Sequence, residues 1–333
     1  MTDYKKLLSE LFEKYDEELA FALDGDIEKY CYKEAVSDEQ GTHDANYSNR
    51  LRLAYTISYT KKYEEHIRID GLIVRLFNEE LFDRETNSFQ GIGSCLEILA
   101  QLLNKYDVPN REILFEQARN ANFDCACGFD SICTRSQDIL PFDSYKIEDA
   151  IDLLIELKEE NLALNLLKEY TYLEDITDEI KMAFCKSRFH ILKDKENELE
   201  ASKKLMNMSI LTGDNFSICC NMLDMIELLN SRKEYNEASR IFDMLIPRLH
   251  SVENWYQIGL GRRSLEQCMD IILNCEDLAE DLWEWSEPFL KKIIDDMHGN
   301  LYKKASFAAY KVGDFIFSEV LSDKYDELMS PLG

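Results

Sequence analysis

Residues 238–247 read ASRIFDMLIP and residues 279–288 read AEDLWEWSEP, so both stretches share an alanine, an aromatic residue four positions later and a late proline. A small side chain lets two helices approach closely, and the large side chain fills the groove beyond it. A proline late in such a segment ends or kinks its helix. The shared pattern therefore predicts the second helix of a repeated helical pair.

The same pattern of a small and then a large residue recurs at nearly constant intervals. Further copies are ENLALNLL with Ala163, ELEASKKL with Ala201 and FIFSEVLS with Ser318. Together with Ala238 and Ala279, these small residues are 38, 37, 41 and 39 positions apart. Short polar joints such as KEEN and KDKEN separate stretches of helical apolar spacing, and joints this short make neighbouring helices antiparallel. We expect one helix-turn-helix unit per period.

These repeats resemble the tetratricopeptide repeat (TPR) family. The likeness lies in A-x3-F…P and in W-x2-L-G, which appears here as Trp255, Ile258 and Gly259. It covers roughly residues 146–330, but the period is longer than the family's 34 residues, and Arg262 stands where the family pattern has a tyrosine. The resemblance implies a right-handed α-solenoid of antiparallel helix pairs, whose concave groove binds extended segments or other proteins. It also implies that Gly259 is a small contact between helices.

Residues 1–145 are less regular, and we interpret them as an irregular helical N-terminal cap or as degenerate repeats. The stretch SDEQGTHDANYSN (37–49) is the most loop-like part of the chain. No linker rich in Pro, Gly or Ser marks a domain boundary. The chain is therefore predicted to be all-α, with residues 146–333 forming one continuous solenoid. The helices predicted before the repeats are 3–20, 47–80, 93–106 and 110–124.

The charge balance restricts the class of partner. The chain has 38 basic and 65 acidic residues, a net charge of −27. Binding to nucleic acid or to an anionic membrane needs a basic surface, so we expect neither. No signal sequence and no run of 18 apolar residues is present, which predicts a cytoplasmic protein. A protein or peptide partner of basic character would suit this field, although the acidity also serves to keep a helical surface soluble.

The most suggestive partner-binding stretch is the acidic run NCEDLAEDLWEWSEPF. Steps of four place Glu276, Glu280 and Glu284 on one helical face. An exposed Trp285 beside that face would anchor a basic peptide or protein. The alternative is a solvated outer helix in which Trp285 covers an apolar seam. The predicted partner-binding residues are Trp255, Arg262, Arg263, Glu276, Glu280, Glu284 and Trp285.

The metal candidate is FDCACGFDSIC, which contains Cys125, Cys127 and Cys133. Thiolates in a turn after a helix can bind zinc, but a structural zinc site needs four ligands. The fourth ligand would have to come from Cys95 or Asp130. The alternative is a helix end whose thiols pack inside the protein.

Catalytic motifs are absent from the sequence. Neither G-x-S-x-G nor a Walker-type G-x4-G-K-[ST] occurs. The glycines Gly259 and Gly261 lead straight into a helical pattern without a preceding strand, which argues against a phosphate-binding loop. Asp295-x-x-His298 lacks the second acidic-x-x-His unit of a di-metal helical bundle.

We therefore predict a non-enzymatic adaptor or scaffold that binds a protein or peptide without a cofactor. A sharper version is an acidic inhibitor, or immunity-type protein, that masks a basic partner. Two alternatives stay open: a peptide- or ligand-sensing helical-repeat regulator, and a metalloprotein or enzyme that uses the Cys125–Cys133 region. The sequence defines neither the face that binds the partner nor the oligomeric state.

Overall fold

In the computed structural model, the chain forms two compact units, Met1–Glu174 (unit 1) and Asp175–Gly333 (unit 2). The structure describes residues 2–38, 41–87, 91–133, 144–173 and 176–330, and for 35–38, 41–43, 131–133 and 173 it describes the backbone alone. Across this described part the fold is helical, with sixteen α-helices and a single two-stranded hairpin. The predicted all-α class is confirmed.

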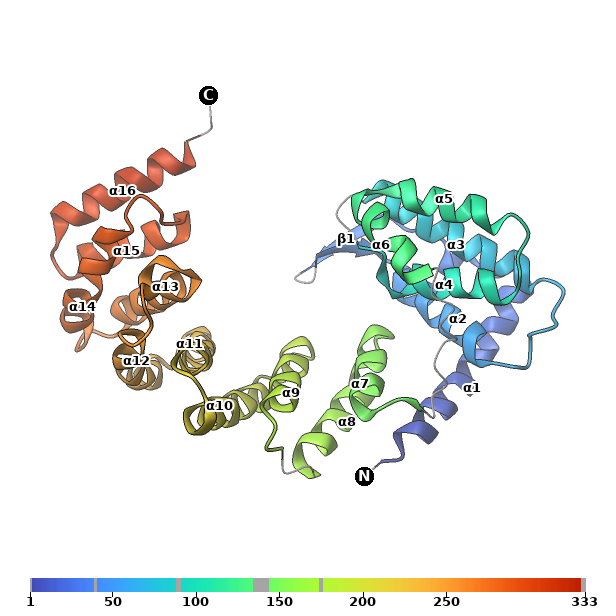
Figure 1. The fold of residues 1–333 in the computed structure, drawn as a ribbon, viewed down its shortest axis with the longest axis horizontal. Helices are drawn as coiled ribbons and strands as arrows, with labels where there is room; N and C mark the ends of the chain where they lie inside the picture. The colour runs from blue at the N-terminus through green and yellow to red at the C-terminus, as the bar shows by residue number, and fades with distance from the viewer. Residues whose placement is uncertain (1, 39–40, 88–90, 134–143, 174–175, 331–333) are drawn as a thin grey trace. The chain divides into compact units, whose positions relative to one another are not determined.

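Unit 2 consists of four helix pairs in which each helix packs against its neighbour in the chain. The pairs follow one another in chain order, α13 contacting both α11 and α15 (Figure 1). A 3-10 turn, η3 (Trp255–Gln257), precedes the third pair. The helices are α9 (Glu179–Ile191), α10 (Lys195–Thr212), α11 (Asn215–Ser231), α12 (Tyr235–Leu249), α13 (Gly259–Asn274), α14 (Ala279–Lys292), α15 (Gly299–Lys311) and α16 (Phe315–Met329).

The two helices of a pair run antiparallel, as side-chain contacts between their far ends show. Thr212, at the end of α10, donates to Glu179 at the start of α9. Arg248, near the end of α12, donates to Asn215 at the start of α11 over 3.1 Å. A Cβ at Gly299, the first residue of α15, would lie 3.8 Å from Met329 at the end of α16. The short polar joints in the sequence therefore connect antiparallel helices, as predicted.

Three of the four joints inside the pairs share one backbone device, which the α13–α14 joint lacks because its backbone is extended at Cys275. Lys193, Lys233 and Gly313 each follow a first helix with positive φ, at 58°, 63° and 86°. In each joint, the amide of the next residue donates to a carbonyl five positions back, as Asp194 does to Phe189 over 2.9 Å. This is the Schellman arrangement, which closes a helix C-terminus and turns the chain. The repeat thus has a structural counterpart at its turns as well as in its helices.

The small residues that define the sequence repeat all lie on second helices and are buried. Ala201, Ala238, Ala279 and Ser318 lie on α10, α12, α14 and α16. Their large partners are buried as well, including Phe242 and Trp283. A buried small residue permits two helices to approach closely. The repeated pattern therefore marks positions where helices pack together, as predicted.

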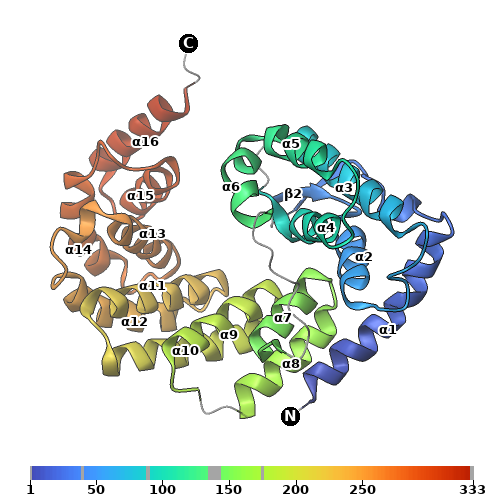
Figure 2. The same cartoon turned by 45° about the vertical axis from the view of Figure 1, so that its right-hand side comes forward.

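Unit 1 contains eight α-helices among its described residues, a 3-10 turn and the hairpin. Figure 2 shows α5 and α6 beside α3 and α4, in agreement with the contacts among these helices. The elements are α1 (Tyr4–Leu23), η1 (Glu28–Tyr30), β1 (Ala35–Asp38), β2 (Gly41–Asp44), α2 (Tyr47–Tyr59), α3 (Ile69–Thr86), α4 (Gly93–Lys105), α5 (Arg111–Ala121), α6 (Phe123–Cys133), α7 (Ile147–Glu156) and α8 (Glu160–Leu173).

The pair α7–α8 carries the first copy of the repeat but packs within unit 1. Tyr15 on α1 donates to Glu159 over 2.5 Å, in the joint between α7 and α8. Thr2 donates to Glu169 of α8 over 2.7 Å. The compact units divide after residue 174. The interpretation of residues 1–145 as a helical cap or degenerate repeats stays a prediction. One solenoid running continuously over residues 146–333 stays a prediction.

Two expectations for the N-terminal half were wrong. The predicted helix 47–80 is two helices, α2 and α3, separated by residues 60–68. The loop-like stretch 37–49 contributes to an antiparallel hairpin, in which Val36 pairs with His43, and to the start of α2. The break at residues 60–68 coincides with the polar stretch TKKYEEHIR, which resembles the joints between the repeat helices. The hairpin is short and polar, so the apolar spacing gives no sign of it.

Five charged residues are buried in the core of unit 1 and hold the hairpin against the helices. Arg50 of α2 pairs with Asp44 of β2 at 2.5 Å and with Glu80 of α3 at 2.7 Å. Arg84 pairs with Glu80 at 3.2 Å and with Asp83 at 2.6 Å. Glu80 thus bridges two arginines. Buried ions need such mutual pairing because their hydration is lost.

In the stretch NWYQIGLGRR (254–263), the close helix contact is made by Gly261 and not by Gly259. Gly259 is exposed at the start of α13, and a Cβ there would meet nothing within 4 Å. Gly261 is buried, and its Cβ would lie 2.4 Å from both the Trp255 carbonyl oxygen and the Tyr256 Cα. The interpretation of Gly259 as the helix contact was therefore wrong. Gly261 is the residue that allows η3 to fold back onto α13.

Candidate functional site

Ion pairs join the first helices of successive pairs in unit 2. Lys186 on α9 donates to Asp224 on α11 over 2.5 Å. Arg263 on α13 donates to the other oxygen of Asp224 over 2.6 Å and to both oxygens of Glu227 over 2.8 and 2.7 Å. Asp224 therefore takes hydrogen bonds from two neighbouring helices, one on each side.

The junction between α13 and α15 is built in the same way. Lys304 on α15 donates to Glu266 over 3.0 Å and to Asp270 over 2.8 Å. These partners are 38 and 34 positions apart, and the pairs Lys186–Asp224 and Asp224–Arg263 are 38 and 39 apart. The separations are close to one sequence period. We call this series of contacts the ion-pair ladder.

The ladder shifts the pKa values of its two aspartates in opposite directions. At Asp224, burial favours the neutral acid, but the hydrogen bonds from Arg263 and Lys186 outweigh it and lower the pKa. At Asp270, burial outweighs the hydrogen bond from Lys304, and the pKa is raised. The hydrogen bond to Glu227 raises the pKa of Arg263, which stays charged. Asp224 is thus the better compensated of the two carboxylates.

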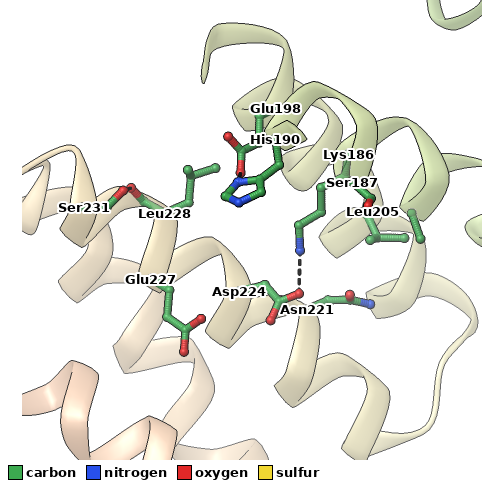
Figure 3. Close-up of a pocket in the computed structure, with 11 residues that line it drawn as sticks. Lys186, Ser187, His190, Glu198, Leu205, Asn221, Asp224, Glu227, Leu228 and Ser231 are labelled. Carbon is green, nitrogen blue, oxygen red and sulfur yellow. Dashed lines mark hydrogen bonds and ion pairs between the residues drawn. The ribbon is translucent and has the colours of Figure 1, made fainter. Parts of the chain in front are cut away.

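A pocket of about 600 Å³ lies where α9 and α10 meet α11. Figure 3 shows Lys186 reaching across to Asp224, with His190 and Glu227 directed toward the same space. The hydroxyl, amide and apolar groups in its wall complete a mixed surface. The lining residues are Ala183, Lys186, Ser187, His190, Glu198, Leu205, Asn221, Asp224, Glu227, Leu228 and Ser231. We call this space the α9–α11 pocket.

Each acidic residue of the α9–α11 pocket has a basic partner. Glu198 lies 2.9 Å from Nδ1 of His190, Asp224 is paired with Lys186, and Glu227 with Arg263. Because Nδ1 of His190 faces the carboxylate, Nε2 is left for a ligand. The local charges nearly balance, so the pocket suits polar, hydrogen-bonding groups more than a bare cation.

In the described structure, the two serine hydroxyls of the pocket form hydrogen bonds with groups other than His190. Ser231 donates to the carbonyl oxygen of Leu228 over 2.7 Å, and Ser187 accepts from Arg188 over 3.3 Å. The His190 side chain is 76% exposed. A nucleophile activated by a base needs a hydrogen bond between the two, and the described contacts do not provide one here.

The tryptophans predicted to bind a partner belong to an aromatic cluster. Trp255 is buried, and its ring stacks on Trp285 with centroids 5.6 Å apart and planes at 12°. Trp285 also meets Phe242 edge-on at 5.4 Å, and Phe289 lies 4.7 Å from Trp255. Trp285 is half-buried, as in the alternative of a ring that covers an apolar seam, and its binding to a partner stays a prediction.

The charged residues predicted to bind a partner are dispersed. Arg263 belongs to the ladder, while Arg262 is exposed beside it. Glu280 and Glu284 are exposed on α14, but Glu276 precedes the helix, so the three do not form one helical row. Partner binding by these residues stays a prediction.

Of the candidate zinc ligands, Cys125 and Cys127 have side chains in the described part of α6. On α6, Cys125 is buried and Cys127 is exposed, so the two thiols face different surroundings. The side chain of Cys133 lies outside the described part of the chain. Burial raises the pKa of Cys125, as it does for Cys95, the proposed fourth ligand. Within the described residues, no group of three metal-ligating side chains is close enough to hold a metal.

The remaining candidates for a fourth ligand or a metal pair have structural roles. Asp130 is paired with Arg119 at 2.5 Å. His298 caps the N-terminus of α15 by accepting from the amide of Leu301 over 3.3 Å, while Asp295 pairs with Lys324. Asp295 and His298 therefore do not share a helical face.

Sequence reasoning missed the pocket because its residues are far apart in the chain. His190 and Glu198 lie on different helices of one pair, and Asp224 lies on the next pair. The one available signal was the spacing of Lys186 and Asp224, 38 positions, which equals one period. Opposite charges one period apart in a stacked repeat are expected to meet.

No protein-family model matches the chain, and a search of curated proteins finds no matching relative. In the described residues, every helix is too short or too polar to cross a lipid bilayer. The site must therefore be interpreted from its own geometry.

Proposed function

We propose that unit 2 is a TPR-like, right-handed helical-repeat module that binds another protein and carries out no catalysis. The antiparallel pairs, their shared turns and the buried small residues one period apart support this repeat class. In the cell the chain would act as an adaptor, or as an inhibitor that masks a basic partner.

The observation that carries this proposal is the α9–α11 pocket. A stacked repeat protein binds extended segments along its successive first helices, and the pocket opens between two of them. His190 and Asn221 offer hydrogen-bonding groups, and Leu205 and Leu228 offer apolar contacts. These groups suit the mixed backbone and side chains of a polypeptide.

The net charge favours a basic partner, although the pocket itself does not. With a charge of −27 the chain attracts a cationic protein at long range and speeds its encounter. Within the pocket the ion pairs nearly cancel, so the fit there depends on shape and hydrogen bonds. Binding should therefore weaken with salt chiefly through a slower association rate.

Site-specific crosslinking tests this function. A photo-reactive amino acid would replace Ala183, which is exposed on the pocket wall, and separately Ala126, which is exposed on α6 of unit 1. We expect the Ala183 position to yield one dominant protein adduct in native cells and the Ala126 position to yield none of it.

A matched pair of substitutions then tests the site with the purified partner. Ala183→Trp fills the pocket and leaves every ion pair in place, so affinity should fall at least tenfold. Ala126→Trp adds the same bulk to an exposed helical alanine of unit 1 and should leave affinity unchanged. Equal affinities for the two variants would exclude the pocket as the binding site.

A further inference from the structure

The last pair of unit 2 exposes a group of large apolar side chains. Tyr310 is 66% exposed and Ile316 is 82% exposed. The rings of Tyr310 and Phe315 meet edge-on at 5.2 Å, which connects the surface of α15 to that of α16. We call this group the end patch, and it comprises Phe307, Tyr310, Phe315, Ile316 and Val320.

The end patch lies where a stacked repeat needs a cover. Two earlier first helices are packed against the next one, α11 against α13 and α13 against α15, and Met269 and Ile272 of α13 are fully buried. In the described chain no further pair packs on α15–α16 (Figure 1). The end patch is therefore an apolar face that no described element covers.

The size of the patch also points to an interface. Its three aromatic rings alone expose on the order of 300–400 Å², and Ile316 and Val320 enlarge that area. An apolar patch of this size is comparable to the largest patch on a typical monomeric protein, and such patches are often functional. A stable interface buries about 800 Å² on each partner, which the patch would reach together with the polar residues around it.

The charges on the two helices identify the partner that fits. α15 has three lysines and no acidic residue, whereas α16 has four acidic residues and one lysine. Lys303 of α15 and Glu319 of α16 are both exposed. In a chain with a net charge of −27, this pair is unusual in carrying equal and opposite charge on neighbouring helices.

A second copy of the chain is complementary to this arrangement. A two-fold axis through the end patch places α15 of one copy near α16 of the other, and does so twice. The exposed Lys303 of each copy then meets the exposed Glu319 of the other around a shared apolar centre, while Lys304 stays in the ion-pair ladder. Most acidic surfaces of this protein would repel a second copy, but this surface would not.

We propose that the end patch is a self-association surface, through which two copies of the chain pack their α15–α16 pairs together around a two-fold axis. The inference is independent of partner binding at the α9–α11 pocket. It predicts a dimer whose stability depends on both the apolar centre and the opposite charges.

Sedimentation equilibrium of the full chain tests the proposal over a wide range of concentrations. We expect a mass of twice 39.0 kDa at high concentration. Ile316→Asp should weaken the dimer at least a hundredfold, and Lys303→Glu at least tenfold. Ile67→Asp, at a 94% exposed position in unit 1, is the matched control and should leave the dimer intact.

Circular dichroism would verify that the Ile316→Asp variant keeps its fold, as its high exposure predicts. A wild-type chain that stays monomeric at every concentration would overturn the proposal and indicate that another protein covers the patch. A dimer that survives Ile316→Asp unchanged would overturn it as well, since the contact would then lie elsewhere.

Discussion

Gly261 lies directly against the backbone of Tyr256: a Cβ at Gly261 would lie 2.4 Å from the Tyr256 Cα. This approach seats η3 on the first turn of α13 and places Trp255 in the aromatic cluster. Backbone atoms cannot move aside as a flexible side chain can. The position therefore excludes every residue but glycine.

We expect Gly261→Ala to lower the free energy of unfolding of unit 2 by about 2–4 kcal/mol through this overlap. Gly259→Ala, two residues earlier in open space, should change it by less than about 1 kcal/mol. All three tryptophans, at 255, 283 and 285, lie in unit 2, so urea unfolding followed by tryptophan fluorescence reports this unit. Equal stabilities of the two variants would contradict the assignment.

Removing Arg50 should destabilise unit 1 strongly. Arg50→Met leaves Asp44 and Glu80 buried with one fewer positive charge, which costs about 3–5 kcal/mol. Lys6→Met, in an exposed pair with Glu10, should cost less than about 0.5 kcal/mol. Hydrogen exchange of peptides from α2 and α3 measures the effect within unit 1. Unchanged exchange in Arg50→Met would show that the buried network contributes little.

Asp224→Asn should reduce stability at neutral pH and have little effect in acid. The folded-state pKa of Asp224 is lowered, so its contribution is complete above the unfolded value of about 3.9 and is lost as the pH falls through the folded pKa. We expect a loss of about 1 kcal/mol at pH 7, given the partial exposure of the ion pairs. The measurement is urea unfolding of unit 2 at several pH values.

Asp270→Asn is the comparison for that experiment. The folded-state pKa of Asp270 is raised, so its ionised form opposes folding above that pKa, and the cost disappears in acid. Lys304 keeps Glu266 as a partner in the variant. The substitution should therefore be close to neutral at pH 7. A larger loss for Asp270→Asn than for Asp224→Asn would refute the assigned directions.

Cys127 should react faster than Cys125, its neighbour on α6. It is exposed, whereas Cys125 is buried and its pKa is raised by burial, so Cys125 holds less thiolate at a given pH. We expect iodoacetamide at pH 8 to label Cys127 at least a hundredfold faster than Cys125, as followed by peptide mass spectrometry. Zinc added beforehand should not protect Cys127. Protection by zinc would restore the metal site of the Cys125–Cys133 region.

The helical pairs could be predicted because their signals are local and recur. Ala238 with Phe242 and Ala279 with Trp283 each lie within one turn of a helix, and repetition at a fixed period separated them from chance. The turns were predictable for the same reason. At Lys193 and Lys233 the polar joint ends one helix and the following acidic residue leads into the next.

What the sequence did not show depends on contacts between distant positions. Arg50 and Glu80 are 30 residues apart, and nothing near either one indicates burial. The acidic neighbours of Trp285 left two interpretations open, an exposed anchor and a cover of an apolar seam, and the stacking of its ring on Trp255 appears only in the fold. Gly259 matched a family position, while the steric need for glycine lies at Gly261. A pattern of residue types cannot separate neighbours that face different surroundings.

Asp224 is shared by Lys186 on one side and Arg263 on the other, which bears on how unit 2 comes apart. If α9 and α10 detach, Asp224 loses Lys186 but keeps Arg263, so the carboxylate is never left as an isolated charge. The first pair can therefore open or be cut by a protease while α11 to α16 stay ordered, as in other linear repeats. Such partial opening would take apart the α9–α11 pocket, because α9 and α10 form two of its walls. A bound partner would then be released while the rest of the unit stays folded.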